Sequence, residues 1–188
     1  MSFSMRVRRG GRADVPAVLG LLDGATEWLV ARGRADQWGT EPHSTNPRRI
    51  EQITGFAEDG GLWIAEAEDP DAAGSSADAQ RSGVQVVGAL AVGEALSYVP
   101  AATEPELYVR LLVTDRRLVG QGIGTQLLDH ARLLARATGA GLLRVDCFAG
   151  GDGALIRYYE KQGFTRAEQF AVPVNDSEWL GQVLIQRL

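Results

Sequence analysis

The sequence predicts an α/β protein, one domain over residues 1–188 in which strands and helices alternate. Three observations predict it. The chain has 188 residues, 45% hydrophobic and 23% charged, which is ordinary for one soluble globular domain. Runs with the two-residue period of strands alternate with runs of helical period. The longest helical run in the second half lies between two apolar strand-like runs, as in a β-α-β crossover.

The first third of the chain predicts a short strand and two helices. Residues 5–10, "MRVRRG", have strand character, and a helix is expected within residues 13–33. Asp14 stands at its start, where a capping side chain is favoured. After a loop-like stretch, Asn46-Pro47 is typical of a cap and first helical position and predicts a second, shorter helix. The first helix rests on the spacing of Val15, Val18, Leu19, Leu22 and Leu29.

The middle of the chain predicts three strands. "LWIAEAE" (62–68) and "GVQVVGALAVGEA" (83–95) alternate well enough to pair, and "PELYVRLLV" (105–113) is the third. The polar, small-residue stretch between the first two has little to bury, so we expect a mobile hairpin loop over residues 69–83.

The last third of the chain predicts two helices and three strands. "GIGTQLLDHARLLARATG" (122–139) carries one apolar helical stripe and stops at Gly139. The remaining segments, in order, are a strand over 141–148, a short helix over 153–162 and closing strands over 163–172 and 178–188.

Composition excludes several classes of function. The net charge is −5, from 19 basic and 24 acidic residues, and the basic ones are scattered, so nucleic acid is not an expected partner. One cysteine and two isolated histidines predict neither a disulfide framework nor a metal site. No apolar run approaches the roughly 20 residues that span a bilayer. We therefore expect no membrane partner and a cytoplasmic location.

The segment "VGQGIG" (119–124) joins a strand to a helix with three glycines. The first turn of a helix presents unpaired N–H groups that favour a negative ligand. The segment is thus interpreted as a pyrophosphate cradle. Its predicted main-chain donors are Gln121, Gly122, Ile123, Gly124 and Thr125. The alternative is that the glycines only allow close packing of strand and helix.

A nicotinamide dinucleotide site is a weaker alternative. Asp146, at the end of the next strand, mimics the acidic residue of that fingerprint. The spacing here is G-x-G-x-G rather than G-x-G-x-x-G, and six residues, "TDRRLV", separate the strand from the first glycine. Both departures disfavour the dinucleotide interpretation.

Residues 105–170 resemble the core of the Gcn5-related N-acetyltransferase (GNAT) superfamily. "VGQGIG" is similar to the motif R/Q-x-x-G-x-G/A, with Val119 in place of the arginine or glutamine. "DGALIRYYEKQGF" resembles N-x-x-A-x-x-x-Y-E-K-x-G-F, with Asp152 on the asparagine. The resemblance implies the GNAT fold, a mixed, mostly antiparallel splayed sheet flanked by helices, and acetyl-CoA as co-substrate without a metal.

The resemblance also implies cofactor contacts. Leu112 and Val113 should offer main-chain groups to the pantetheine and thioester, and Val119, Gly120 and the five donors above would hold the phosphates. Asp152 either contacts the cofactor or caps the short helix.

The same resemblance implies that Tyr159 is the general acid. A tyrosine hydroxyl has a pKa of about 10, so it is protonated at neutral pH and can donate its proton to a departing thiolate. Tyr158 points roughly 100° away on a helix and is expected to be structural. The identity of the general base stays open between Glu106, Asp146 and a chain of water molecules.

The acceptor should be bound by the first helix, the loop after it and the strands. Trp38 and Gln37 are the cleft candidates, Glu41 lies near them, and Trp28 is assigned to the core. Tyr108, which shares a strand face with Glu106 and Arg110, is a further candidate contact.

The expected activity is acetyl transfer to a primary amine of a small molecule or peptide by direct attack in a ternary complex. The alternative is a non-catalytic acyl-CoA-binding or sensor module. Whether the chain forms a homodimer stays open.

Overall fold

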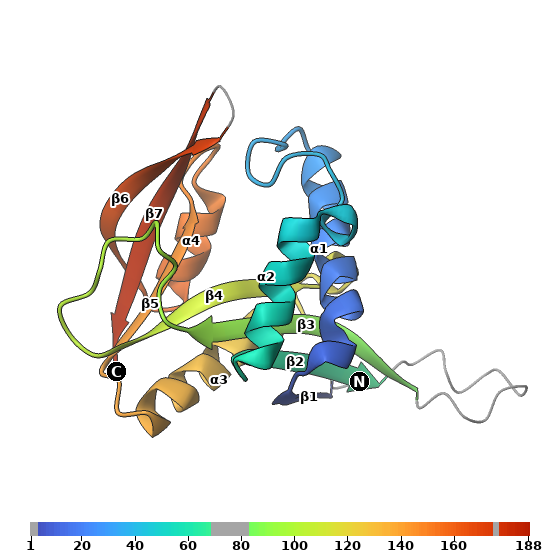
Figure 1. Cartoon of the computed structure of the whole chain (residues 1–188), viewed down its shortest axis with the longest axis horizontal. Coiled ribbons are helices and arrows are strands. Elements are labelled where there is room, and N and C mark those ends of the chain that lie inside the picture. Colours follow the sequence, from blue (N-terminus) through green and yellow to red (C-terminus); the bar gives the residue numbers. More distant parts are fainter. Residues whose placement is uncertain (1–3, 69–82, 175–176) are drawn as a thin grey trace, which may run out of the picture.

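The computed structural model describes residues 4–68, 83–174 and 177–188, and its described strands form one seven-stranded sheet in the order β1-β2-β3-β4-β5-β7-β6 (Figure 1). Every predicted helix and strand is present in the predicted order. The elements are β1 (Met5–Arg9), α1 (Val15–Val30), α2 (Pro47–Glu58), β2 (Leu62–Glu68), β3 (Val84–Gly93), β4 (Glu106–Thr114), α3 (Ile123–Ala137), β5 (Leu142–Phe148), α4 (Ala154–Lys161), β6 (Thr165–Val174) and β7 (Ser177–Arg187).

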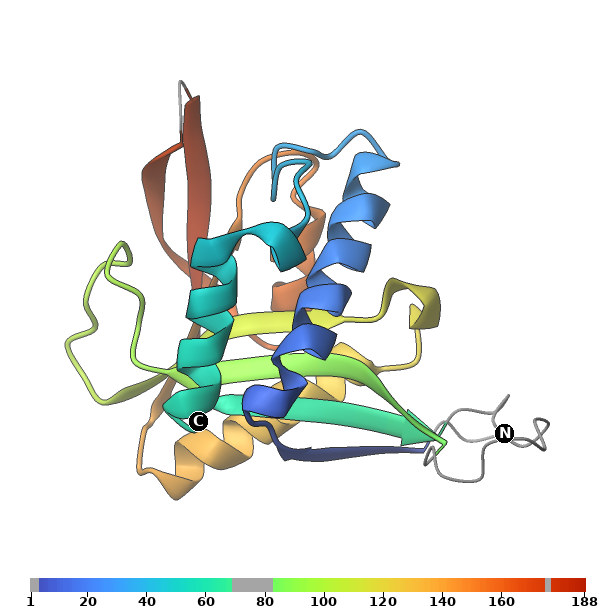
Figure 2. The same cartoon turned by 45° about the vertical axis from the view of Figure 1, so that its right-hand side comes forward.

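Helices cover both faces of the sheet. On one face α1 and α2 lie together (Figure 2). The apolar stripe of α1 packs there with Ile53 and Phe56 of α2 on strand residues such as Ile64 and Ala89. On the other face α3 and α4 bury Leu127 and Ile156 in a separate apolar cluster. The sheet is therefore the middle layer, and its α1–α2 face is distinct from its α3–α4 face.

The sheet forks between its two parallel strands. All other neighbours are antiparallel, whereas β4 and β5 pair in parallel from Glu106↔Leu142 to Val109↔Val145. Beyond that pair β4 continues to Thr114 and β5 to Phe148 without pairing to each other. The predicted splayed sheet is confirmed, and the fork leaves one backbone edge of β4 open.

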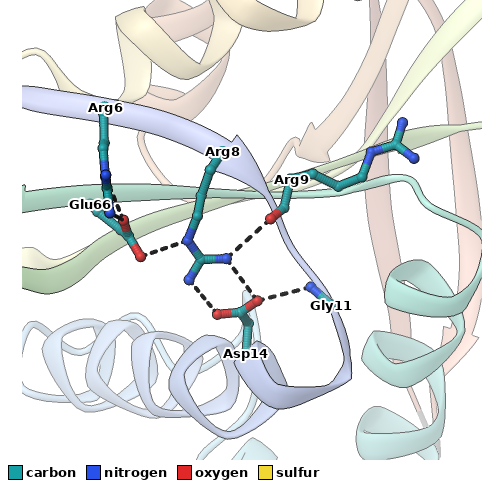
Figure 3. Close-up of polar contacts among 6 residues, drawn as sticks. All are labelled: Arg6, Arg8, Arg9, Gly11, Asp14 and Glu66. Carbon is teal, nitrogen blue, oxygen red and sulfur yellow. Dashed lines mark hydrogen bonds and ion pairs between the residues drawn. The ribbon is translucent and has the colours of Figure 1, made fainter.

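A polar cluster ties the edge strand β1 to the start of α1 (Figure 3). Asp14 does not cap α1 with its side chain, so that prediction was wrong; its own backbone is already helical, with φ −87° and ψ −13°. Its carboxylate accepts from Arg8, at 2.6 and 3.0 Å, and from the Gly11 N–H at 2.9 Å. Glu66 of β2, 7% exposed, accepts from Arg6 at 2.8 Å and Arg8 at 2.6 Å.

Other local predictions can be placed. Asn46 caps α2, accepting from the N–H groups of Arg48 and Arg49. The predicted hairpin loop, residues 69–83, lies outside the described residues except for Gly83. Within the described ranges three short 3-10 helices were not predicted, at Arg12–Asp14, His43–Thr45 and Arg116–Leu118, because three residues show no period. None of the helices in the described ranges is both long and apolar enough to cross a membrane.

Candidate active site

A cavity of about 570 Å³ opens at the fork of the sheet. Four segments line it: the end of α1 with the loop after it, the end of β4 with the turn that follows, the glycine segment with the start of α3, and the end of β5 with α4. Segments far apart in the sequence therefore meet in one space whose size suits a small organic ligand.

The glycine segment forms one wall of this cavity. Gly120 and Gly122 have φ of 86° and 75°, a left-handed backbone that other residues adopt only under strain. α3 begins at Ile123, so the N–H groups of its first turn face no acceptor within the helix. Of the predicted donors, Gln121 is the exception, because its N–H already donates to the Leu118 carbonyl at 3.3 Å and its side chain does not line the cavity.

Gly124 serves close packing as well as the turn. A Cβ built on it would collide with the hydroxyl of Tyr158, which reaches across from α4. Both interpretations of the glycines thus apply, the open turn at Gly120 and Gly122 and the close contact at Gly124. Tyr158, expected to be structural, packs on Gly124 and also lines the cavity. Burial raises the pKa of Tyr158, and the nearby Arg116 and Arg132 lower it.

Tyr159 is a buried residue of the cavity wall. It is 5% exposed and contacts the rings of Tyr158 and Phe164 edge-on, with centroids 5.2 and 5.7 Å away. Among the described residues its hydroxyl has no hydrogen-bonding partner, and the residue lines the cavity. Burial raises the pKa of this hydroxyl well above its usual value, so the group stays protonated at neutral pH.

Asp146 stands just beyond the last β4–β5 pair. Its Oδ1 accepts a hydrogen bond of 2.5 Å from the hydroxyl of Tyr108, which is fully buried. Burial raises the pKa of the Asp146 carboxyl, although the Tyr108 hydrogen bond and the charge of Arg144 lower it. Neither residue lines the cavity, so Tyr108 is placed to position Asp146 rather than to touch a ligand there.

Glu106 is at the opposite end of β4 from the fork. It pairs with Arg144 at 2.9 Å, and that buried guanidinium also donates to the Pro100 carbonyl at 2.7 Å. The carboxylate is therefore engaged in holding the chain around Pro100 against the sheet. Neither Glu106 nor Asp146 lines the cavity, but Glu106 is at the paired end of β4 and Asp146 is at the fork, so of these two candidates for the base the position favours Asp146.

The two tryptophans near α1 exchange the places expected for them. Trp28, assigned to the core, lines the cavity. Trp38, assigned to the cleft, packs on the apolar cluster of α1 and α2 with its ring 5.6 Å from that of His43. Gln37 does line the cavity, and its carbonyl accepts from Trp179 Nε1 at 3.0 Å, which ties the loop to β7. Glu41 is exposed and outside the cavity wall.

Some of the predicted cofactor contacts line the cavity and one has its side chain buried elsewhere. Leu112 and the exposed Val119 line the cavity, whereas the Val113 side chain is buried under α1. Asp152 lines the cavity and also accepts from the Ala154 N–H at 3.0 Å, at the start of α4. Its other oxygen accepts from Arg34 at 2.8 Å, an ion pair across the cavity mouth.

Sequence reasoning missed Arg116. It lines the cavity from the 3-10 turn after β4, with its guanidinium carbon 4.9 Å from the centre of the Trp28 ring. The neighbouring Arg117 takes the capping carboxylate of Asp115 at 2.6 Å. In the sequence the pair is simply "RR" in a polar stretch, with no signal that one of the two turns inward.

A mixed sheet that opens between parallel strands beside a glycine-lined helix N-terminus is the arrangement that the resemblance to the N-acetyltransferases, a class of acyltransferases, implies. The sequence matches the family model of the acetyltransferase (GNAT) family over residues 25–164, and the chain belongs to this family of acetyl-CoA-dependent acyltransferases. No group of three or more histidine, cysteine or acidic side chains in the described residues could hold a metal ion.

Comparisons with known proteins agree on this fold. The uncharacterized N-acetyltransferase YesJ of Bacillus subtilis (strain 168) is 27% identical over 151 residues, covering 80% of this chain and 76% of the relative. A ribosomal-protein-alanine N-acetyltransferase from Brucella melitensis matches with a TM-score of 0.63 at 22% identity, over 97% of this chain and 99% of that chain. The putative acetyltransferase yncA from Salmonella typhimurium, solved with its cofactor acetyl-CoA, matches with a TM-score of 0.61 at 18% identity, over 97% and 93%.

Proposed function

We propose that residues 1–188 form a single-domain N-acetyltransferase that transfers the acetyl group of acetyl-CoA to a primary amine of a small molecule or peptide. The observation that carries the proposal is the cavity at the fork. It brings the open edge of β4, the first turn of α3 and the buried hydroxyl of Tyr159 to one space.

The cavity suits acetyl-CoA as the donor. The unpaired N–H groups of Gly122, Ile123, Gly124 and Thr125, with the helix dipole behind them, would hold the phosphates, and Gly120 keeps the turn open. The edge of β4 around Leu112 and Val113 would bond the pantetheine arm as an added strand does. Val119 and Asp152 border the same space.

The chemistry assigned to the protein is proton transfer and charge stabilisation. The thioester supplies an activated acetyl group, and direct attack by the amine in a ternary complex forms the amide and releases the thiol. A main-chain N–H at the open edge of β4 would stabilise the charge that builds on the carbonyl oxygen. Tyr159 would donate its proton to the departing sulfur. Asp146, which does not line the cavity, would take the proton lost by the amine through water, and its raised pKa suits that role.

The acceptor would enter from the side of α1. Trp28 and Gln37 line the cavity there, and they supply an aromatic surface and a polar group. Tyr108 supports the same region indirectly, through Asp146. These groups fit an amine on either a small molecule or a peptide.

Thermal melting tests the cofactor part. A ligand that binds only the native state stabilises it, so acetyl-CoA should raise the melting temperature. Gly122→Asp should abolish that rise by placing a negative charge in the phosphate site. Gly139→Asp is the matched control, since Gly139 has the same φ of 75° but lies at the other end of α3. A shift caused by NAD and not by CoA would refute the assignment.

Turnover against a panel of amines, followed by release of free CoA thiol, tests the enzymatic part. We expect release above the hydrolytic background with at least one amine. Binding of acetyl-CoA with no turnover across the panel would instead favour the non-catalytic sensor.

A further inference from the structure

The charged side chains on the cavity wall leave one cation without a partner. Among the described lining residues they are Arg34, Asp36, Arg116 and Asp152. The two arginines and two aspartates cancel in charge, and Arg34 is already paired with Asp152 at 2.8 Å. Arg116 makes no ion pair and no hydrogen bond within the described residues. The wall is thus neutral as a whole, yet the proposed donor is a polyanion.

The surroundings of Arg116 leave one of its hydrogen-bond donors without an acceptor. Its Nε is shielded from solvent and has no acceptor within the described part of the chain, and its guanidinium lies against Trp28 at 4.9 Å. An N–H that has lost water and gained no acceptor is unfavourable, and an anion that pairs with the guanidinium would satisfy it. Arginine is also the side chain whose planar fork best matches a phosphate.

The position of Arg116 points to the phosphate end of the cavity. Arg116 begins the 3-10 turn that leads directly into the glycine segment, and both line the cavity. Its positive charge also lowers the pKa of Tyr158, whose hydroxyl lies against Gly124 in the first turn of α3, and that of Tyr159. Arg116, Tyr158 and the start of α3 therefore surround one region. Val119, where the resemblance expects an arginine or glutamine, is 65% exposed and offers no charge there.

We propose that Arg116 is the residue that pairs with a phosphate of the bound acetyl-CoA, in place of the side chain that Val119 lacks. The inference rests on the proposed function. A carboxylate on the acceptor is the other source from which such an anion could come, and the experiment separates the two.

Calorimetric titration with CoA, and with pantetheine, which has no phosphate, tests the proposal. Arg116→Gln should weaken CoA binding by about 10- to 100-fold, the usual effect of losing a charged hydrogen bond, and change pantetheine binding by less than about 3-fold. Its melting temperature without ligand should not fall, because a shielded N–H without an acceptor has been removed. Arg32→Gln is the matched control, since Arg32 stacks on Trp28 at 3.9 Å without lining the cavity.

A relocated charge gives a second readout. The double variant Arg116→Gln with Val119→Arg should regain part of the lost CoA affinity, which a purely structural role of Arg116 would not allow. Unchanged CoA affinity in Arg116→Gln overturns the inference, and a raised KM for the acceptor in that case assigns the anion to the acceptor. Equal losses for CoA and pantetheine also overturn it. If the wild-type chain binds no CoA, the proposed function itself fails.

Discussion

The hydroxyl of Tyr108 donates to Oδ1 of Asp146 at 2.5 Å, across the two parallel strands and one residue past the last pair they form. The bond therefore sits where the sheet divides. On the N-terminal side of the fork β4 and β5 are held together by backbone pairing, and on the C-terminal side they do not pair with each other. A carboxylate fixed at that point has a defined position relative to the open edge of β4.

Asp146→Asn should remove the acid limb of the pH profile. As a base Asp146 acts only when ionised, so kcat/KM of the wild type should fall as the pH drops through its pKa, which burial raises above the ordinary value of about 4. The variant should lose roughly 10²-fold in turnover and show no such limb. Glu106→Gln, at the far end of β4, should keep both the limb and the rate.

Tyr108→Phe tests the positioning role of the same pair. The Tyr108 hydrogen bond lowers the pKa of Asp146 against the larger effect of burial, so its removal should raise that pKa further. The acid limb of kcat/KM should then move to higher pH while the maximal rate falls only a few-fold. A limb that stays in place would show that the group titrating in the profile is not Asp146.

Tyr159→Phe separates an acid from a packing residue. The ring is kept, and the hydroxyl has no partner among the described residues, so the free energy of unfolding should change by less than about 1 kcal/mol. Turnover should fall by roughly 10²-fold or more, with CoA affinity within a few-fold. Tyr158→Phe removes a hydroxyl from the same cavity at Gly124 and should change turnover only a few-fold. Unchanged turnover in Tyr159→Phe, where chemistry limits the rate, would leave solvent as the proton donor.

The order of elements could be predicted from the sequence because each long run shows its own period and each helix start its own signal. The Asn46-Pro47 pair and the stripe of α1 are local properties. The lining of the cavity is not local. Which of Trp28 and Trp38 faces the fork depends on where α1 lies over the sheet, and that is set by packing between distant segments.

Two other differences have similar causes. Glu106 shares a strand face with Tyr108, but the distance along the strand from the fork decides whether it can act on a ligand, and its partner Arg144 comes from another strand. Arg116 lies in a 3-10 turn that is too short to show a pattern. Its role depends on Arg117 taking the neighbouring carboxylate.

The ion pairs that Arg8 makes with Asp14 and Glu66 should make the free energy of unfolding depend on pH in the acid range. The hydrogen bond from Arg8 lowers the pKa of Asp14, and Arg8 with Arg6 lowers that of Glu66 despite its burial. The unfolded chain then binds more protons than the folded one, so this contribution is complete above the unfolded pKa values of about 3.9 and 4.3 and is lost as the pH falls below them. Urea unfolding at pH 7 and pH 3.5 measures the loss.

Arg8→Gln should reduce the loss of stability between pH 7 and pH 3.5. The substitution removes one partner each from Asp14 and Glu66, whose side chains are only 14% and 9% exposed. The free energy of unfolding should therefore fall by about 1–3 kcal/mol at pH 7. The difference between pH 7 and pH 3.5 should be smaller than in the wild type. Arg12→Gln breaks an exposed pair with Glu58 and should change stability by less than about 0.5 kcal/mol at either pH. Equal effects of the two variants would show that the cluster contributes no more than a surface ion pair.

Gly124→Ala tests the contact between the first turn of α3 and α4. The new Cβ would collide with the Tyr158 hydroxyl, so the variant should lose about 1–3 kcal/mol of stability and bind acetyl-CoA more weakly as the turn shifts. Gly20→Ala, inside α1 with open space at its Cβ, is the matched control and should gain up to about 1 kcal/mol. Combining Gly124→Ala with Tyr158→Phe removes the colliding oxygen, so the double variant should recover much of the loss in both stability and affinity. Strictly additive effects in this cycle would mean that α3 is not held against Tyr158, and that the geometry of its first turn is set by the glycines alone.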